Sequence, residues 1–339
     1  MTITAQPQPD RPDPTVIAVQ NDAFRKLACL GVPPAQPIQG RMHVTRSLME
    51  AGDGFMAEAV KATGEFVTFE PENDPEGWHD FGAVQIRGET VFWAAGCASC
   101  HAAPDAEGDA RLVLAGGYRI NSPFGTFVAP NISPSDAGIA GWSAADLADA
   151  LIAGVSPEGQ HYYPSLPYTT YTHMTLPDVA DLKAYMDTLP PSDVASQPHD
   201  IGFPFNIRRG LGLWKRLYLD DDWVMPADTP QLERGRYLVE ALGHCAECHT
   251  PRDQFGGLDK ARWLQGAPNP SGDGRIPGID PGSLSWSAQD ITYYLESGFT
   301  PEFDSAGGEM TDVIANMAKL SAEDREAIAA YVKSVPPAQ

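Results

Sequence analysis

The sequence contains CASCH at residues 97–101 and CAECH at residues 245–249. Both are copies of the pattern C-x-x-C-H, and their first cysteines are 148 positions apart. Thiols at positions i and i+3 lie on one side of a single helical turn, and the histidine follows directly. Each copy therefore presents two thiols and one imidazole from the same short segment.

The pattern C-x-x-C-H is the attachment signature of c-type haem, in which the thiols bond to the two vinyl groups and the histidine binds the iron. A redox C-x-x-C pair would stand near a βαβ pattern, and zinc-binding pairs lie closer together in sequence. Buried cysteines beside an unrelated histidine are the remaining alternative. The predicted haem-binding residues are Cys97, Cys100, His101, Cys245, Cys248 and His249.

An internal repeat surrounds the two motifs. Each unit has Arg-Gly before its motif, a proline 29 or 28 residues after the motif's histidine, a Trp-Ser helix start and a last helix that ends at Pro-Pro. Serine with an aspartate three residues later predicts a capping box, and the early glycine predicts close helix packing. The repeated segments are 87–88 and 234–235, 129–133 and 276–280, 142–147 and 286–291, and 182–191 and 328–337.

Both units resemble class I cytochrome c domains. The phrases GGYRINSPFGTFVAPNISPS, FPFNIRR and GHCAECHTPRDQFGGLDKARWLQGAPNPSG make about three quarters of the chain similar to periplasmic di-haem cytochromes of bacterial dehydrogenases. The resemblance implies a mainly α fold with two tandem class I cytochrome c domains. The expected divisions are a cytochrome c domain at 87–191, a connector at 192–230 and a second cytochrome c domain at 231–339.

The first 86 residues resemble a small bacterial family of unknown function, mainly through ENDPEGWHDFGAVQIRGETVFW at 72–93. The resemblance implies a small α/β N-terminal domain, and the alternating apolar pattern from Ala83 to Phe92 agrees with a strand there. This segment is expected to be a fusion with the cytochrome. His79, Asp80 and the lone Cys29 are expected to be structural rather than metal-binding.

Haem iron needs two axial ligands, and His101 and His249 are the expected proximal ones. For the second haem we predict Met310, which the resemblance places in the phrase GGEM, and we expect Met317 in the core. For the first haem we predict Met174, again from the resemblance, with His173 and His161 as alternatives. Met186 is expected in the core. Alignment of the last helices places Pro164 opposite Met310, and some relatives have methionine at Leu166.

Several residues are expected to support the haems. Pro130 and Pro277 resemble the proline whose carbonyl accepts the proton of the proximal histidine. The basic run at 203–218 has two functional interpretations, in which it holds the two domains together or docks a partner, and the alternative to both is a solvated linker. The candidates for contacts with haem propionates are Tyr118, Arg119, Trp142, Arg252 and Arg275.

Composition excludes several classes of protein. The 45 acidic and 23 basic residues give a net charge of −22, which argues against a nucleic-acid partner. No run approaches the roughly 18 to 20 apolar residues of a membrane-spanning helix. No secretory signal is visible in the first 20 residues, although haem c attachment follows export in the families resembled. The chemistry therefore predicts the periplasm.

An iron with both histidine and methionine ligands has no open position, which predicts outer-sphere transfer of single electrons and no catalysis. The expected donor is a dehydrogenase, and the expected acceptor is an oxidase or another cytochrome. One alternative is a di-haem peroxidase, which needs a free iron position. The other is an N-terminal binding or regulatory module fused to a cytochrome without function.

Overall fold

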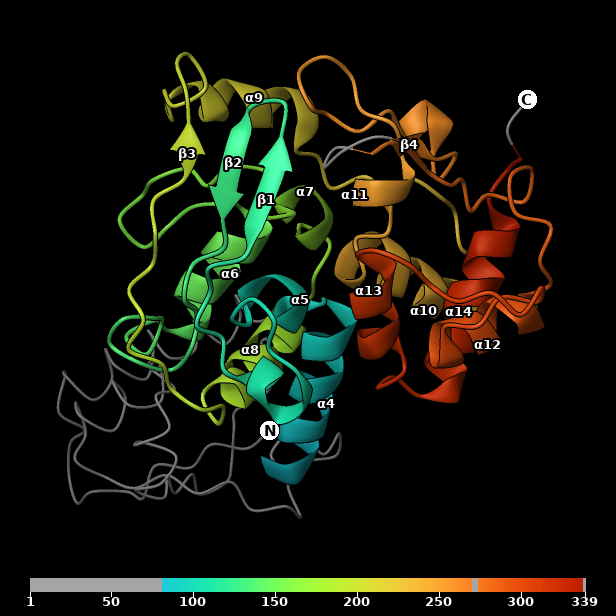
Figure 1. The fold of residues 1–339 in the computed structure, drawn as a ribbon, viewed down its shortest axis with the longest axis horizontal. Coiled ribbons are helices and arrows are strands. Elements are labelled where there is room, and N and C mark those ends of the chain that lie inside the picture. The colour runs from blue at the N-terminus through green and yellow to red at the C-terminus, as the bar shows by residue number, and fades with distance from the viewer. Residues whose placement is uncertain (1–80, 270–273, 338–339) are drawn as a thin grey trace, which may run out of the picture.

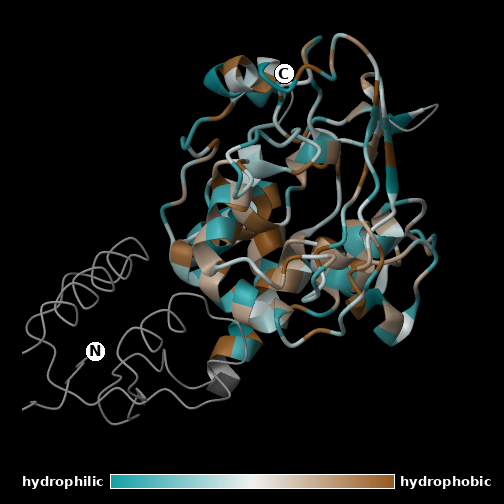
Figure 2. Ribbon diagram, turned by 90° about the vertical axis from the view of Figure 1, so that its left-hand side faces the viewer, coloured by the Kyte–Doolittle hydropathy of each residue, from teal (hydrophilic) through white to brown (hydrophobic). Residues whose placement is uncertain are grey.

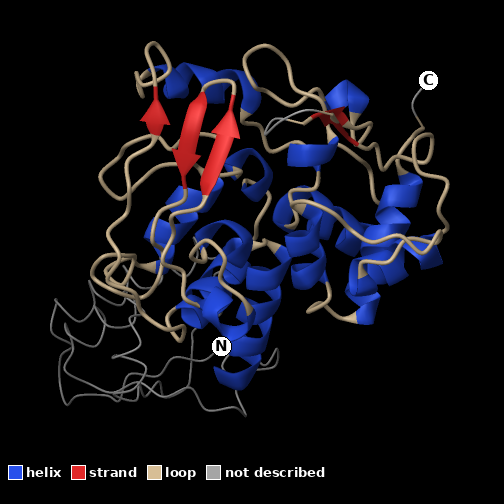
Figure 3. Cartoon of the chain, viewed as in Figure 1, coloured by secondary structure: helices blue, strands red, loops and turns tan. Residues whose placement is uncertain are grey.

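The computed structural model describes residues 81–269 and 274–337 (Figure 1). Residues 1–80 of the N-terminal domain expected at 1–86, with Cys29, His79 and Asp80, lie outside these ranges. Helices dominate the described part and strands are few and short (Figure 3), which confirms the mainly α prediction.

The two repeat units are helical packages in chain order. The first contains α4 (Phe81–Ala94), α5 (Cys97–His101), the 3-10 turn η2 (Gly108–Leu112), β1 (Arg119–Ser122), β2 (Gly125–Val128), α6 (Ala144–Ile152), α7 (Tyr168–Tyr171) and α8 (Leu176–Met186). The connector contains β3 (Asp200–Ile201) and α9 (Gly210–Tyr218). The second contains α10 (Pro230–Arg236), the π-helix η3 (Tyr237–Leu242), α11 (Ala246–His249), η4 (Lys260–Arg262), β4 (Ala267–Pro268), β5 (Arg275–Ile276), α12 (Ala288–Ser297), α13 (Met310–Met317) and α14 (Ala322–Ser334).

The first and last helices of each unit pack closely at a glycine. A Cβ atom on Gly88 would lie 2.1 Å from the carbonyl oxygen of Asp181 on α8, and one on Gly235 would lie 2.1 Å from that of Ala327 on α14. No side chain larger than hydrogen fits at these distances. The close helix packing predicted at both glycines is therefore confirmed.

The prediction of a strand over Ala83 to Phe92 is wrong, because α4 is a continuous helix there. Its C-terminal end is buried on several sides, against α8 and against the second unit. Consecutive residues from Val91 to Ala95 are all buried, which hides the 3.6-residue period that a one-sided helix would show. Helix α4 thus belongs to the first helical unit.

Capping boxes start the corresponding helices α6 and α12. The Ser143 backbone NH donates to Asp146 Oδ2 at 2.8 Å, and the Ser143 hydroxyl accepts from the Asp146 NH at 3.2 Å. Ser287 and Asp290 repeat this arrangement in the second unit. Both predicted caps are confirmed.

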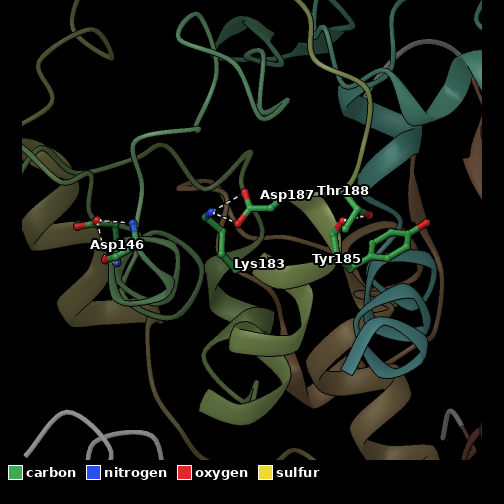
Figure 4. Close-up of polar contacts among 6 residues, drawn as sticks. Asp146, Lys183, Tyr185, Asp187 and Thr188 are labelled. Atoms are coloured by element: carbon green, nitrogen blue, oxygen red, sulfur yellow. Dashed lines mark hydrogen bonds and ion pairs between the residues drawn. The ribbon is translucent and has the colours of Figure 1, made fainter. Parts of the chain in front are cut away.

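Figure 4 shows Asp146 beside the C-terminal end of α8. There the ammonium of Lys183 donates to both carboxylate oxygens of Asp187.

The connector contacts both units. Its first part adds β3 to the antiparallel sheet β1-β2-β3, with Gly125 opposite Ile201. Helix α9 lies at the top of the view in Figure 1, above β1 and β2. The ammonium of Lys215 donates to Ala153 O at 2.7 Å in the first unit, and the indole NH of Trp214 donates to Phe255 O at 2.9 Å in the second. The connector therefore holds the units together, as one of the two interpretations expected.

The buried apolar residues of the two units form one continuous cluster. Figure 2 shows apolar residues gathered in the helices at the centre of the molecule. No helix within residues 81–269 and 274–337 combines the length and apolar character needed to cross a bilayer.

Candidate functional site

Both C-x-x-C-H motifs form one helical turn. In the first, α5 spans the whole motif from Cys97 to His101. In the second, Cys245 precedes α11, and the His249 NH donates to Cys245 O at 3.0 Å. All four motif cysteines are free thiols. Each turn therefore presents both sulfur atoms and the imidazole together, as the spacing predicted.

Each motif histidine is oriented by a proline carbonyl. His101 Nδ1 lies 2.9 Å from Pro130 O, and His249 Nδ1 lies 2.7 Å from Pro277 O. With Nδ1 donating, Nε2 carries the lone pair that binds a metal. Burial lowers the pKa of both imidazoles below their usual value, which favours the neutral, metal-binding form. The hydrogen bonds predicted for both prolines are confirmed.

Burial also keeps the thiols protonated. Desolvation raises the pKa of Cys97 and Cys245 to about 12 and that of Cys100 and Cys248 to about 11. The carboxylate of Glu309 contributes to the pKa shift at both Cys100 and Cys248, and Cys248 contributes to the shift at Cys100. Glu309 therefore acts on one thiol of each attachment turn.

Three of the four methionines of interest are buried in the core cluster, and Met310 is partly buried against it. Met174 occupies the turn between α7 and α8 and is 5% exposed, whereas Met310 is the first residue of α13 and is partly buried. Met186 and Met317 are inside the core, as expected. Met174 directly precedes Thr175, the N-cap of α8.

The alternative histidines of the first unit have other partners. His173 stacks on Trp223 of the connector, with ring centroids 4.2 Å apart. His161 Nδ1 lies 3.1 Å from the ammonium of Lys215. Both rings are therefore engaged in contacts with the connector.

The candidates for propionate contacts are dispersed. The Tyr118 hydroxyl donates to Glu309, and Arg252 donates to Gly256 O at 2.7 Å and pairs with Glu247. Trp142 packs against the core. Arg119 and Arg275 are exposed on strands β1 and β5. Tyr118 and Arg252 thus have protein partners in the structure.

Contacts between the two units were not predicted from the sequence. The Asn316 amide donates to Ser99 Oγ at 2.7 Å, and the Thr170 hydroxyl donates to Glu247 Oε1 at 3.3 Å. Ser99 and Glu247 occupy the same position in the two motifs, and Thr170 and Asn316 occupy the same position before the last helices. The signal that could have found them is a polar residue at matched positions of both repeats.

These contacts are reciprocal. Helix α7 of the first unit packs on η3, and the corresponding helix α13 of the second packs on α4. Near the centre, the carbonyl oxygen of Ala95 accepts hydrogen bonds from Tyr171, in its own unit, and from His244 of the second unit, at 2.9 and 3.2 Å. The two units therefore contact each other through corresponding elements, α7 in the first and α13 in the second.

The donor set fits haem c. Two free thiols and one neutral imidazole project from each turn, and the imidazole Nε2 is left for iron. Among the described residues, no group of three or more His, Cys, Asp or Glu side chains could hold a metal ion.

Comparison with known proteins agrees with this chemistry. Residues 85–190 and 232–336 match the Cytochrome c family. Residues 44–100 match a family described as a protein of unknown function (DUF3768), which overlaps the first cytochrome c match.

Several curated relatives are similar over the haem-binding part. A protein from Cereibacter sphaeroides named "Diheme cytochrome c-type" is 60% identical over 277 residues, 81% of this chain and 94% of the relative. The fructose dehydrogenase cytochrome subunit of Gluconobacter japonicus is 37% identical, over 74% of this chain and 52% of the relative. The quinone alcohol dehydrogenase cytochrome c subunit of Gluconacetobacter polyoxogenes is 34% identical, over 75% and 56%.

The chain thus spans nearly the full Cereibacter protein but about half the length of these dehydrogenase subunits. The repeat, the two attachment turns and the two family matches coincide. The chain belongs to the cytochrome c family, with one cytochrome c domain around each attachment turn and two haem c groups as its cofactors.

Proposed function

We propose that this di-haem cytochrome is a periplasmic electron carrier that accepts single electrons from a dehydrogenase and passes them to an oxidase or another cytochrome. The observation that carries the proposal is the pair of attachment turns, each with its histidine held by a proline carbonyl and each hydrogen-bonded to the other unit. Relatives named as cytochrome subunits of fructose and alcohol dehydrogenases support the class of donor.

Each domain holds its haem through the residues of one turn. Cys97 and Cys100 would bond to the first haem and His101 would bind its iron, and Cys245, Cys248 and His249 would do the same for the second haem. When bound, each haem supplies a one-electron Fe(III)/Fe(II) couple. The protein residues would hold it in place and fix the imidazole through the proline carbonyl.

Met174 and Met310 are the proposed sixth ligands. The engagement of His173 with Trp223, and of His161 with Lys215, supports Met174 for the first haem. For the second haem, Met310 opens α13 directly after Glu309, whose charge acts on both Cys100 and Cys248. A thioether on each iron closes both coordination shells, which favours electron transfer over the alternative peroxidase activity.

The interface favours transfer between the two haems. The buried cluster is continuous across the domains, and each attachment turn is hydrogen-bonded to the other domain. An electron that enters at one haem therefore has a short protein path to the other. Two haems in series extend the distance that one molecule can bridge between donor and acceptor.

The outward face of α9 is the proposed docking surface for the dehydrogenase. Leu213 and Leu217 are 65% and 66% exposed, and the exposed Arg209 and Arg216 flank them at helical spacing. Exposed apolar side chains beside arginine are typical of protein interfaces. In a chain of net charge −22, this local positive charge fits a donor with acidic residues around an apolar centre.

Helix α9 also lies close to the second haem turn. Its inner face contacts the loop that follows His249, where the Tyr218 hydroxyl donates to Asp253 at 2.7 Å. A donor bound to the outer face would therefore deliver electrons first to the second haem.

The test is reduction of oxidised holoprotein by the catalytic subunit of fructose dehydrogenase or of quinone alcohol dehydrogenase, each freed of its own cytochrome and given its substrate. We expect at least one to reduce both haems. The double variant Leu213→Glu/Leu217→Glu should lower the second-order rate of reduction while haem content stays at two. Failure of both donors, with full reduction by dithionite, would contradict a donor of this class.

A further inference from the structure

The contact between the domains includes a buried amide. Asn316 on α13 is 1% exposed, and its Nδ2 donates to Ser99 Oγ at 2.7 Å. Its Oδ1 accepts from Arg111 at 3.3 Å, and Arg111 also pairs with Asp312, one turn earlier on α13, at 3.3 Å. A Cβ on Gly96 would come within 3.4 Å of the same amide. The amide is therefore fixed at both ends and tightly enclosed.

Ser99 lies inside the first attachment turn, between Cys97 and Cys100. Helix α13, which carries Asn316, begins at Met310, the proposed ligand of the second haem. Figure 1 shows α13 beside α4 and α5 at the centre of the molecule, and α13 packs on α4. One hydrogen bond thus joins the attachment turn of one haem to the ligand helix of the other.

The corresponding contact, between the second attachment turn and the first domain, has longer hydrogen bonds. Glu247 in the second attachment turn accepts from Thr169 and Thr170 at 3.3 Å, on α7, which Met174 follows. Glu247 is also held by Arg252 within its own domain. Asn316 is therefore the stronger of the two links across the interface.

We propose that Asn316 is a positioning residue for electron exchange between the two haems, acting through Ser99. A buried hydrogen-bonded amide has a fixed orientation, since breaking it leaves polar groups without partners. It holds the turn that carries the first haem at one distance from the helix that carries the ligand of the second. This inference rests on the proposed function, because it takes both haems as redox-active and Met310 as a ligand.

The experiment compares holoprotein variants for the rate of inter-haem exchange, measured by pulse radiolysis after one-electron reduction. Asn316→Ala and Ser99→Ala should each slow exchange by about tenfold, since a misplacement of about 1 Å can cost up to about a hundredfold in rate. Ser99→Thr keeps the hydroxyl and should restore the rate. The double variant should be no slower than Asn316→Ala, because that single variant already removes the bond to Ser99.

Matched measurements separate this inference from the function beneath it. Thr292→Ala removes an exposed hydrogen bond within α12, to Ala288 O, that does not join the two domains, and it should leave exchange unchanged. If Asn316→Ala fails to fold, the Ser99→Ala and Ser99→Thr pair decides. If Ser99→Ala binds two haems and its rate of inter-haem exchange equals that of the wild type, the inference is overturned. If the wild-type protein contains no methionine-ligated haem, the proposed function is overturned instead.

Discussion

In the first domain the proposed methionine ligand lies in the turn before the last helix, whereas in the second it opens the preceding helix. Met174 occupies the position that Leu320 holds in the second domain, and Pro164 stands where Met310 would be expected. The attachment turns, glycine contacts and capping boxes are nevertheless the same in both. Backbone geometry thus constrains haem attachment more tightly than it constrains the source of the sixth ligand.

The largest expected effect comes from removing the two methionines. Met310→Ala and Met174→Ala should each convert one haem from low spin to high spin and leave the other unchanged, because each removes the thioether of one iron. Electronic absorption spectra and electron paramagnetic resonance spectra of the oxidised protein measure the spin state of each haem.

Met317→Leu is the control, since Met317 is a core residue and both haems should stay low spin. If Met174→Ala left both haems low spin, Met174 would not be the sixth ligand of the first haem. His173 and His161 would then be the next ligands to test.

A smaller effect is expected at the glycine contacts. Gly88→Ala and Gly235→Ala should each lower the free energy of unfolding by on the order of 1–3 kcal/mol, because the new methyl group overpacks a helix contact in the same way in both domains. Denaturant unfolding of the holoproteins measures this.

Gly141→Ala is the matched control, because a Cβ at that position meets nothing within 4 Å. A loss at Gly235 without one at Gly88 would show that the two helix pairs are not equivalent.

The smallest effect is expected at the capping boxes. Ser143→Ala and Ser287→Ala should each cost about 1 kcal/mol, because each leaves the helix start without its side-chain acceptor. The urea midpoints of the two variants should agree closely.

Ser143→Asp and Ser287→Asp keep a capping oxygen and should retain most of the stability. Equal midpoints for wild type and both alanine variants would contradict a stabilising role for the boxes.

Much of this arrangement could be predicted from the sequence, and the exceptions have separate physical causes. The histidine–proline hydrogen bonds, the caps and the glycine contacts follow from local spacing repeated in both units. The strand predicted over Ala83 to Phe92 failed because a helix end buried on several sides loses its period. The three-stranded sheet has strands of two to four residues, too short to show alternation.

The link between Ser99 and Asn316 could not be predicted either. The two residues are 217 positions apart, and their contact depends on how the two domains pack rather than on either domain alone. A sequence repeat indicates two similar units but does not determine the surface at which they meet.

The most direct test of the account is the intact denatured mass of the full chain, matured by a cytochrome c assembly system. The account predicts the polypeptide plus two covalent haems, one of which is lost in Cys97→Ala/Cys100→Ala and the other in Cys245→Ala/Cys248→Ala. A full-length chain with no added mass would contradict a di-haem electron carrier.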